Sequence, residues 1–128
     1  MAGKHLVLLG DSVFDNQAYV ARGRAVVDHL RRTLPPSDRV TLLAMDGDGS
    51  QDIPDQLRRL PPDTTHLALS VGGNDVLGCL HAFNAPCRSV SEAFTHLNEL
   101  QSQFASSYRS AVSMVARWQL PCVVCTIY

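Results

Sequence analysis

The stretch His5-Leu-Val-Leu-Leu-Gly-Asp-Ser12 begins as a short apolar run and then changes abruptly to small polar residues. A continuous apolar run of about four to eight residues that stops at a turn residue is typical of a strand buried on both faces of a sheet. Similar runs occupy 39–44 and 65–71, and each is also followed by glycines and polar residues. The chain is therefore expected to form a sheet of buried strands that end in polar loops.

Helical patterns lie between these strands. Apolar residues recur at helical spacing in 24–34, and a Ser89-Val-Ser-Glu92 capping box precedes a longer stripe that runs to Trp118. A cap at Ser50 or Asp52, with Pro54 in the first turn, predicts a short helix over 53–60. Strands that alternate with helices predict a parallel sheet with right-handed crossovers. The elements expected in chain order are strand 5–9, helix 24–34, strand 39–44, helix 53–60, strand 65–71, an irregular segment 72–88 with one helical turn near 77–80, one long helix after residue 89, and strand 122–128.

Composition narrows the class of protein. The 128-residue chain is 45% hydrophobic and 18% charged, which fits one folded domain over residues 1–128. Its 11 Lys and Arg against 12 Asp and Glu give a net charge of −1. No basic field is therefore expected to hold nucleic acid or an anionic membrane. No apolar run approaches the roughly 18 residues that a transmembrane helix needs.

The N-terminus predicts a location in the cytoplasm. The apolar run 6–9 is too short for the core of a signal peptide, and no small-residue cleavage site follows it. The cysteines at positions 79, 87, 122 and 125 are then expected to be reduced. The Cys122-Val-Val-Cys125 pair lies in a strand-like run, where residues three apart point to opposite faces, so redox or zinc chemistry is not expected there.

Three polar loops follow the three buried strands, at the edge where open parallel sheets bind ligands. Ser12 follows the first strand, at a turn that can expose its hydroxyl. Gly49 follows the second strand, and a glycine lets a backbone N–H approach a ligand closely. Asn74 follows the third strand, and its side-chain NH2 can donate to a developing negative charge. Each residue alone also fits a plain turn or a helix cap, so it is their shared edge that favours a ligand site.

Motifs for metals and common cofactors do not match. The loop 46–52 is rich in aspartate, but an EF-hand that begins at Asp46 needs glycine at position 51 and glutamate at position 57, where the chain has Gln51 and Leu57. The sequence contains neither a P-loop nor a dinucleotide-binding glycine pattern. No metal and no cofactor are therefore expected.

Leu9-Gly-Asp-Ser-Val-Phe-Asp-Asn16 resembles the first block of the SGNH hydrolases, also called GDSL esterases or lipases. Gly49 matches the glycine of the second block, and Gly72-Gly-Asn-Asp75 matches the third. The three blocks stand in the family's order, each after an expected strand, and the resemblance spans essentially the whole chain. It implies a flavodoxin-like three-layer α/β/α fold with a parallel sheet in the strand order 2-1-3-4, without the family's fifth strand.

The resemblance also implies a chemistry. The chain would be a serine hydrolase that cleaves small-molecule esters through an acyl-enzyme, without a metal. Ser12 would be the nucleophile, and the oxyanion would be held by the backbone N–H groups of Ser12 and Gly49 and by the side chain of Asn74. Asp11 and Asp75 would be supporting residues. The acyl and alcohol portions of the substrate are not indicated by the sequence.

One block of the family is missing. Its Asp-x-x-His supplies the general base and the residue that orients it, and nothing after 122–128 corresponds to it. Among the five histidines, His81 is expected on the same edge as Ser12, either as a substitute base or as an ordinary loop histidine. The chain is therefore expected to be an impaired, truncated form of a larger domain, or a short form completed by another chain.

Other interpretations remain open. Because strand 122–128 would form an exposed edge of the sheet, self-association through that edge is expected. A different class of function is a non-catalytic α/β binding or interaction module that keeps the pocket. A flavodoxin-like redox or signalling domain would need a bound flavin or an acidic phosphoacceptor cluster. It is less favoured because Asp11 is the single carboxylate in the first turn.

Overall fold

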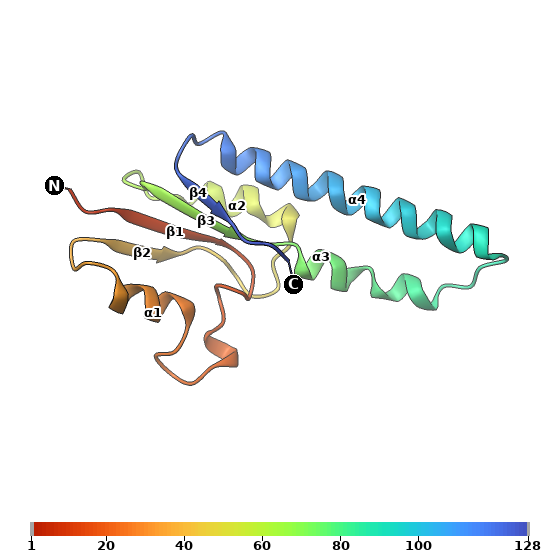
Figure 1. Ribbon diagram of the computed structural model, residues 1–128, viewed down its shortest axis with the longest axis horizontal. Helices are drawn as coiled ribbons and strands as arrows, with labels where there is room; N and C mark the ends of the chain where they lie inside the picture. The colour runs from red at the N-terminus through yellow and green to blue at the C-terminus, as the bar shows by residue number, and fades with distance from the viewer. Residues whose placement is uncertain (1, 128) are drawn as a thin grey trace.

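The computed structural model describes residues 2–127 and contains a four-stranded sheet with helices on both faces (Figure 1). The elements in chain order are β1 (His5–Gly10), the 3-10 helix η1 (Gln17–Tyr19), α1 (Val26–Thr33), β2 (Arg39–Leu42), η2 (Ser50–Asp52), α2 (Ile53–Leu57), β3 (His66–Ser70), α3 (Gly73–Gly78), η3 (Leu80–Asn84), α4 (Val90–Ala116) and β4 (Cys122–Val124). The expected alternation of strands and helices is confirmed.

All strands of the sheet are parallel, in the order β2-β1-β3-β4. Val7 in β1 lies opposite Thr41 on one side and Leu67 on the other, and Ala68 in β3 lies opposite Val123. The predicted α/β class and the order 2-1-3-4 are therefore confirmed. Since the strands are parallel, the loops that follow β1, β2 and β3 leave the sheet at one common edge.

The sheet separates two apolar cores, as a three-layer fold requires. One core lies between the sheet and the helices α2 and α4, and the other lies on the α1 side (Figure 1). Alternate residues of β1 serve the two cores, with Val7 and Leu9 in the first and Leu8 in the second. The first core consists of Val7, Leu9, Ile53, Leu57, Leu67, Leu69, Val71, Ala111 and Val115.

The segment 72–88 is more regular than the sequence indicates. It holds the six-residue helix α3 and the five-residue 3-10 helix η3, whereas one helical turn near 77–80 was expected. Glycines at both ends of α3, Gly73 and Gly78, lower its helix propensity. A helix this short also contains too few turns to show an apolar stripe.

The long helix α4 begins as predicted. Ser89 is its N-cap, and the Ser89 Oγ accepts a hydrogen bond from the Glu92 N–H at 3.1 Å. The helix ends at Ala116, not at Trp118, because Gln119 takes a positive φ of 54°. Only Ala111 and Val115 of α4 are buried, while Phe94 near its start is 67% exposed. None of the helices in residues 2–127 combines the length and apolar character that crossing a membrane requires.

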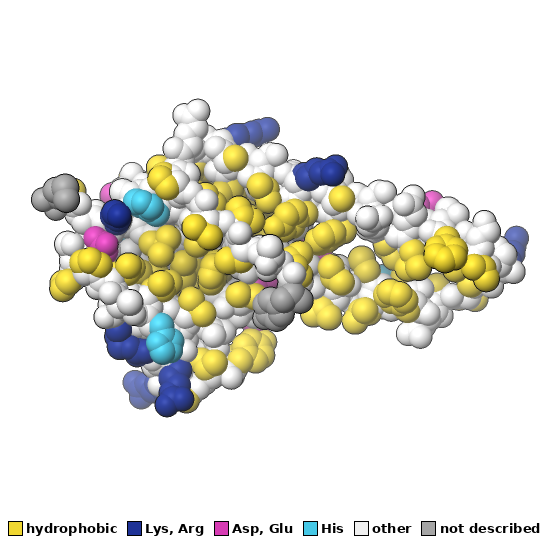
Figure 2. Space-filling model, viewed as in Figure 1, with side chains coloured by type: hydrophobic (Ala, Val, Ile, Leu, Met, Phe, Trp, Pro, Cys, Tyr) yellow, Lys and Arg dark blue, Asp and Glu magenta, His cyan; other side chains and the backbone are white. Residues whose placement is uncertain are grey.

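The strand β4 is shorter than predicted. It covers Cys122–Val124, and the chain then stays close to β3 through a hydrogen bond from the Cys125 N–H to the Leu69 carbonyl at 2.8 Å. The predicted last residue of this strand, Tyr128, lies outside the described residues. All three residues of β4 are exposed, and Figure 2 shows apolar side chains gathered over this part of the sheet. The four cysteines are free.

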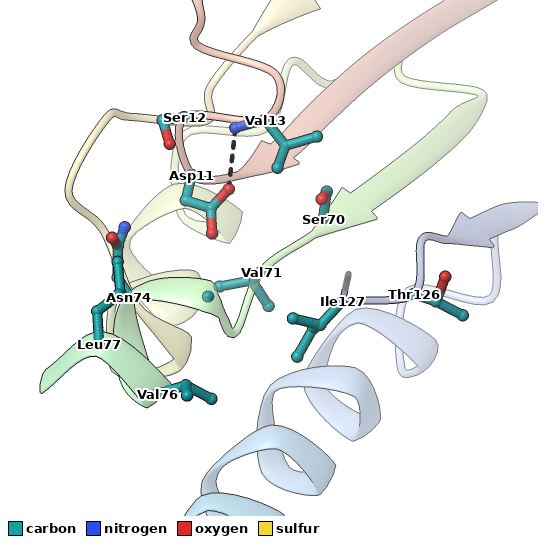
Figure 3. A pocket seen from close by; sticks show the side chains of 11 residues that line it. Asp11, Ser12, Val13, Ser70, Val71, Asn74, Val76, Leu77, Thr126 and Ile127 are labelled. Carbon is teal, nitrogen blue, oxygen red and sulfur yellow. Dashed lines mark hydrogen bonds between the residues drawn. The ribbon is translucent and has the colours of Figure 1, made fainter. Parts of the chain in front are cut away.

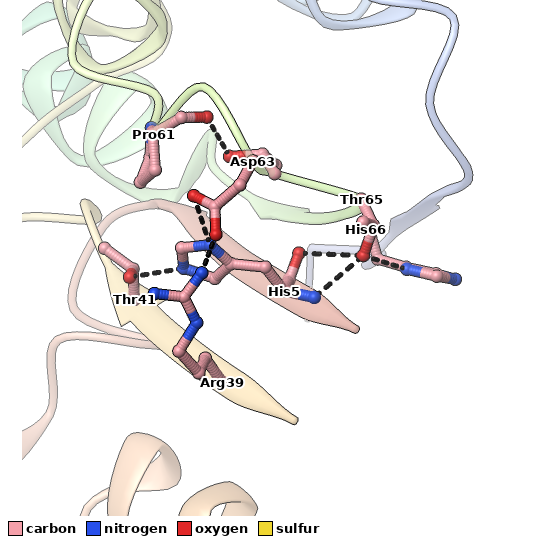
Figure 4. A network of polar contacts seen from close by, with 8 residues as sticks. His5, Arg39, Thr41, Pro61, Asp63, Thr65 and His66 are labelled. Carbon is pink, nitrogen blue, oxygen red and sulfur yellow. Dashed lines mark hydrogen bonds and ion pairs between the residues drawn. The ribbon is translucent and has the colours of Figure 1, made fainter. Parts of the chain in front are cut away.

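A polar network lies at the opposite edge of the sheet, where the strands begin (Figure 4). The buried His5 ring contacts Asp63 Oδ1 through Nδ1 at 3.1 Å and Thr41 Oγ1 through Nε2 at 2.7 Å. Arg39 forms an ion pair with the other carboxylate oxygen of Asp63. Burial, and secondly the charge of Arg39, lower the pKa of His5 below its ordinary value of 6.5. This network joins the beginnings of β1 and β2 to the loop before β3.

Gly10 should tolerate no side chain. Its φ is +130°, and a Cβ at this position would lie 1.8 Å from the carbonyl oxygen of Ser70. We expect Gly10→Ala to lower the free energy of unfolding by about 3 kcal/mol, measured by urea denaturation. Gly78→Ala is the matched control, since no heavy atom lies within 4 Å of its Cβ position, and it should change stability by less than about 1 kcal/mol. Equal effects of the two substitutions would contradict the close packing at Gly10.

Acidification should destabilise the protein through His5. Because its pKa is lowered in the folded state, the unfolded chain takes up this proton first, and stability falls as the pH drops below the ordinary value of 6.5. His5→Gln removes the titration, so it should flatten the decline in urea midpoint between about pH 7.5 and 5.5. His96→Gln, at an exposed position of α4, should keep the wild-type decline. A decline of the same steepness in all three proteins would show that His5 does not cause it.

Candidate functional site

The turn after β1 presents Ser12. The backbone of Gly10 packs against Ser70 in β3, and the Asp11 N–H donates to the Ser70 carbonyl at 3.1 Å. The chain then reverses, and the N–H groups of Phe14 and Asp15 donate to the Asp11 carbonyl at 3.2 and 3.0 Å. Ser12 lies partly exposed on this turn. Within residues 2–127, neither its hydroxyl nor its backbone N–H has a hydrogen-bond partner, so both can meet a ligand.

The buried side chain of Asp11 stabilises the same turn. Its carboxylate Oδ1 accepts a hydrogen bond from the Val13 N–H at 3.0 Å, and the residue is 4% exposed. Burial raises the pKa of Asp11, while the hydrogen bonds from backbone N–H groups oppose the shift. These contacts fit the supporting role that the resemblance gives to Asp11.

Ser12 lines a hollow of about 310 Å³ at the carboxyl edge of the sheet (Figure 3). In this view Asp11 and Ser12 lie at the top, Asn74 and Val76 of α3 lie at the left and below, and Ile127 lies at the right. The complete lining is Asp11, Ser12, Val13, Ser70, Val71, Gly73, Asn74, Val76, Leu77, Thr126 and Ile127. The structure thus brings Ser12 and Asn74 into one hollow whose remaining wall is largely apolar.

Asn74 is held by the loop after β2. One hydrogen of its side-chain amide goes to the backbone carbonyl of Asp48 at 2.9 Å. An amide NH2 has two hydrogens, so the second is available to a group inside the hollow. Next to it, Asp75 accepts hydrogen bonds from the N–H and the hydroxyl of Ser50 at 3.0 and 3.1 Å. The loops after β2 and β3 are therefore tied together at both residues.

Gly49 takes a different place from the one expected. It is buried beside Ser50 and is not among the residues that line the hollow. Its N–H donates to Asp52 Oδ2 at 2.8 Å, as part of the cap of η2. To donate to an oxyanion, this N–H would have to be shared with Asp52 or released by it. The role of Gly49 as an oxyanion donor therefore stays a prediction.

No histidine lines the hollow within residues 2–127. His81 lies in η3, is exposed, and directs its Nδ1 to the Gly78 carbonyl at 2.8 Å. His5 and His66 lie at the beginnings of their strands, at the far edge of the sheet. Nor does the described part of the chain contain a group of three His, Cys, Asp or Glu side chains that could hold a metal ion.

Sequence reasoning missed Gln56. This residue of α2 is fully buried and sits between the loops after β1 and β2. Its Oε1 accepts from the Gly10 N–H, and its Nε2 donates both to the Gly10 carbonyl and to Asp48 Oδ2, each at 2.8 Å. A usable signal existed, because Ile53, Gln56 and Leu57 share one helix face. A glutamine on an apolar face needs hydrogen-bond partners in the core.

No protein-family model and no curated protein sequence matches the chain. Among solved structures, phospholipase A1 from Streptomyces albidoflavus NA297 matches with a TM-score of 0.64 and 20% identity, over 96% of this chain and 59% of that one. An extracellular lipase from Streptomyces rimosus matches with a TM-score of 0.61 and 15% identity, over 95% and 58%.

A third solved structure is described as a member of the SGNH-hydrolase family. AlinE4, described as an SGNH-hydrolase family esterase, matches with a TM-score of 0.52 and 19% identity, over 94% of this chain and 75% of that one. The chain spans less than two thirds of the length of the two Streptomyces enzymes. At these identities the likeness concerns the fold, and it agrees with the resemblance of the sequence blocks. This chain has the fold of the SGNH-hydrolase esterases and lipases.

Proposed function

We propose that this chain carries the nucleophile and part of the oxyanion hole of an ester hydrolase. The observation that supports the proposal most is the hollow shared by Ser12 and Asn74, in which the Ser12 hydroxyl and backbone N–H are free of partners within residues 2–127. A hydroxyl next to N–H donors is the arrangement that acyl transfer needs. The solved structures that share the fold are named as esterases and lipases, which favours the same reaction here.

The reaction would proceed in two steps. Ser12 Oγ attacks the ester carbonyl carbon and loses its proton to a base, while the oxyanion accepts hydrogen bonds from the Ser12 N–H and the Asn74 amide. The tetrahedral intermediate collapses, the C–O bond to the alcohol breaks, and the alcohol leaves with a proton. Water then attacks the acyl-serine, which releases the carboxylic acid and restores the hydroxyl. The resemblance assigns the base to a histidine that residues 2–127 do not place in the hollow.

The walls of the hollow favour an apolar acyl group. Val71, Val76, Leu77 and Ile127 face the space next to Ser12 and Asn74 (Figure 3). These side chains offer no hydrogen-bond partner to a sugar or a charged group, whereas an alkyl chain gains about 25 cal/mol per Å² of apolar surface buried. We therefore infer a small-molecule ester with an aliphatic acyl chain. Self-association through β4, a cytoplasmic location and the absence of nucleic-acid partners stay predictions of the sequence.

A second candidate function is a binding module that keeps the hollow without catalysis. The observation that favours it is the lack of a histidine among the residues that line the hollow within residues 2–127. Such a module would bind an apolar ligand but would leave the Ser12 hydroxyl unreactive. Reactivity of Ser12 therefore separates the two functions.

A fluorophosphonate should label Ser12 once a base is supplied. A serine hydroxyl without an adjacent base is a weak nucleophile, so without imidazole the turnover of p-nitrophenyl acetate should stay little above background and barely change in Ser12→Ala.

Added imidazole can replace a missing histidine side chain as proton acceptor in the labelling of Ser12 by the fluorophosphonate. It should raise the labelling rate by at least about tenfold, read by intact mass and peptide mapping.

Two variants control this experiment. Ser12→Ala should abolish labelling, while Ser70→Ala, which removes another hydroxyl from the hollow, should keep it. Brisk labelling without imidazole that is lost in His81→Ala would show that His81 is the base. Failure to label the folded chain even with imidazole would refute the ester-hydrolase proposal and favour the binding module.

Asn74 should act on the rate of acylation. Its amide is expected to stabilise the oxyanion in the transition state, so Asn74→Ala should lower the imidazole-dependent acylation rate by roughly a hundredfold with little change in ligand binding. The measurement is the concentration dependence of labelling, which separates the maximal rate from the half-saturating concentration. Asn98→Ala, at an exposed position of α4, should leave both values unchanged. An unaltered maximal rate in Asn74→Ala would remove Asn74 from the oxyanion hole.

A further inference from the structure

Gln56 joins the two loops that meet at the hollow. It comes from α2, which packs against the sheet in the first core, and its side chain is fully buried. Three hydrogen bonds of 2.8 Å occupy its amide, two to the backbone of Gly10 and one to the carboxylate of Asp48. Both hydrogens and the oxygen of the amide are therefore used, and each has a distinct partner.

Gly10 and Asp48, the partners of Gln56, each lie next to one of the two groups proposed to act in acyl transfer, Ser12 and Asn74. Gly10 ends β1, and Ser12 follows it by two residues at the turn. Asp48 carries the backbone carbonyl that accepts the Asn74 amide at 2.9 Å. A displacement of the Gln56 amide would thus move the Ser12 turn and the Asn74 side chain relative to each other. The hydrogen bonds from the Met45 N–H to the Gly10 carbonyl and from the Asp46 N–H to Asp15 also join the two loops, but the Gln56 amide is the buried side chain that contacts both Gly10 and Asp48.

We propose that Gln56 is a positioning residue, which holds the Ser12 turn and the Asn74 amide in the relative placement that acyl transfer needs. This inference rests on the proposed function for its consequence in catalysis, while the placement itself is a property of the fold. Within residues 2–127, Gln56 forms no hydrogen bond with a side chain that lines the hollow, and it acts through Gly10 and Asp48. The position requires both an acceptor and a donor: Oε1 accepts from the Gly10 N–H, while Nε2 donates to the Gly10 carbonyl and to the Asp48 carboxylate. A glutamine amide supplies both.

Gln56→Glu tests the donor. The substitution keeps the shape of the side chain but replaces the Nε2 donor with an oxygen, which then faces the Gly10 carbonyl and the Asp48 carboxylate. Two carboxylates in such contact raise the pKa of the pair, so the pair takes up one shared proton as the pH falls, and this proton restores a hydrogen bond. The labelling rate of Gln56→Glu relative to wild type should therefore be about 10- to 100-fold reduced near pH 7.5 and recover toward about pH 5.5.

Two further variants sharpen the test. Gln103→Glu introduces the same chemical change at an exposed position of α4, and its rate relative to wild type should stay close to one at every pH. The double variant Gln56→Glu with Asp48→Asn restores a donor opposite position 56, so it should recover most of the rate near pH 7.5 and lose the pH-dependent defect. It also avoids the paired carboxylates, so it can be measured even if Gln56→Glu alone does not fold at that pH.

A second measurement does not depend on reactivity. The NMR signals of the Asn74 side-chain NH2 and the Ser12 backbone N–H should shift in Gln56→Glu near pH 7.5, return toward the wild-type positions on acidification, and stay unshifted in Gln103→Glu. In the double variant they should lie near the wild-type positions. If wild-type Ser12 is never labelled, the proposed function fails, and these signals still decide the role of Gln56. Signals and relative rates that do not differ between the variants at positions 56 and 103 would overturn the inference.

Discussion

The close approach of two backbones, Gly10 in β1 and Ser70 in β3, is the constraint on which the site depends. A Cβ on Gly10 would collide with the Ser70 carbonyl, so the strands come this close only because Gly10 has no side chain. The positive φ of Gly10 then turns the chain out of the sheet, and the Asp11 N–H secures the turn on Ser70. Ser12 reaches the edge of the sheet as a consequence of this packing, not through contacts of its own.

The placement of the other groups follows from a chain of buried and partly buried polar contacts. Gln56 binds the end of β1 and the Asp48 carboxylate, Asp48 binds Asn74, and Ser50 binds Asp75. Buried polar groups that are fully satisfied fix one geometry, because any rearrangement leaves a donor or an acceptor without a partner. Within residues 2–127 no buried side-chain polar atom lacks a partner, and separating the three loops would break the hydrogen bonds of Gln56, Asn74 and Asp75.

The fold was predictable from the sequence to the extent that strands and helices carry distinct apolar patterns. The runs at 5–9 and 65–71 and the capping box at Ser89 indicated the sheet and the long helix. The short helix α3 was missed because its six residues include two glycines, and Trp118 was placed in α4 although Gln119 ends that helix with a positive φ. Ser12 and Asn74 share a hollow as their loops predicted, but Gly49 has its N–H on Asp52, a local cap that spacing alone does not reveal.

Placement and proton transfer are separate properties of this site. Residues 2–127 form the contacts described above that place Ser12 and Asn74, which include the packing of Gly10 against Ser70 and the hydrogen bonds of the Gln56 amide. No histidine among these residues lines the hollow, so the described part of the chain places the proposed nucleophile, Ser12, without a histidine base beside it. Oxyanion-hole donors alone retain about a thousand- to ten-thousandfold acceleration over water in a serine protease that has lost its triad. A site of this kind can therefore be correctly built and still react slowly, which is why its geometry and its reactivity have to be measured by different observables.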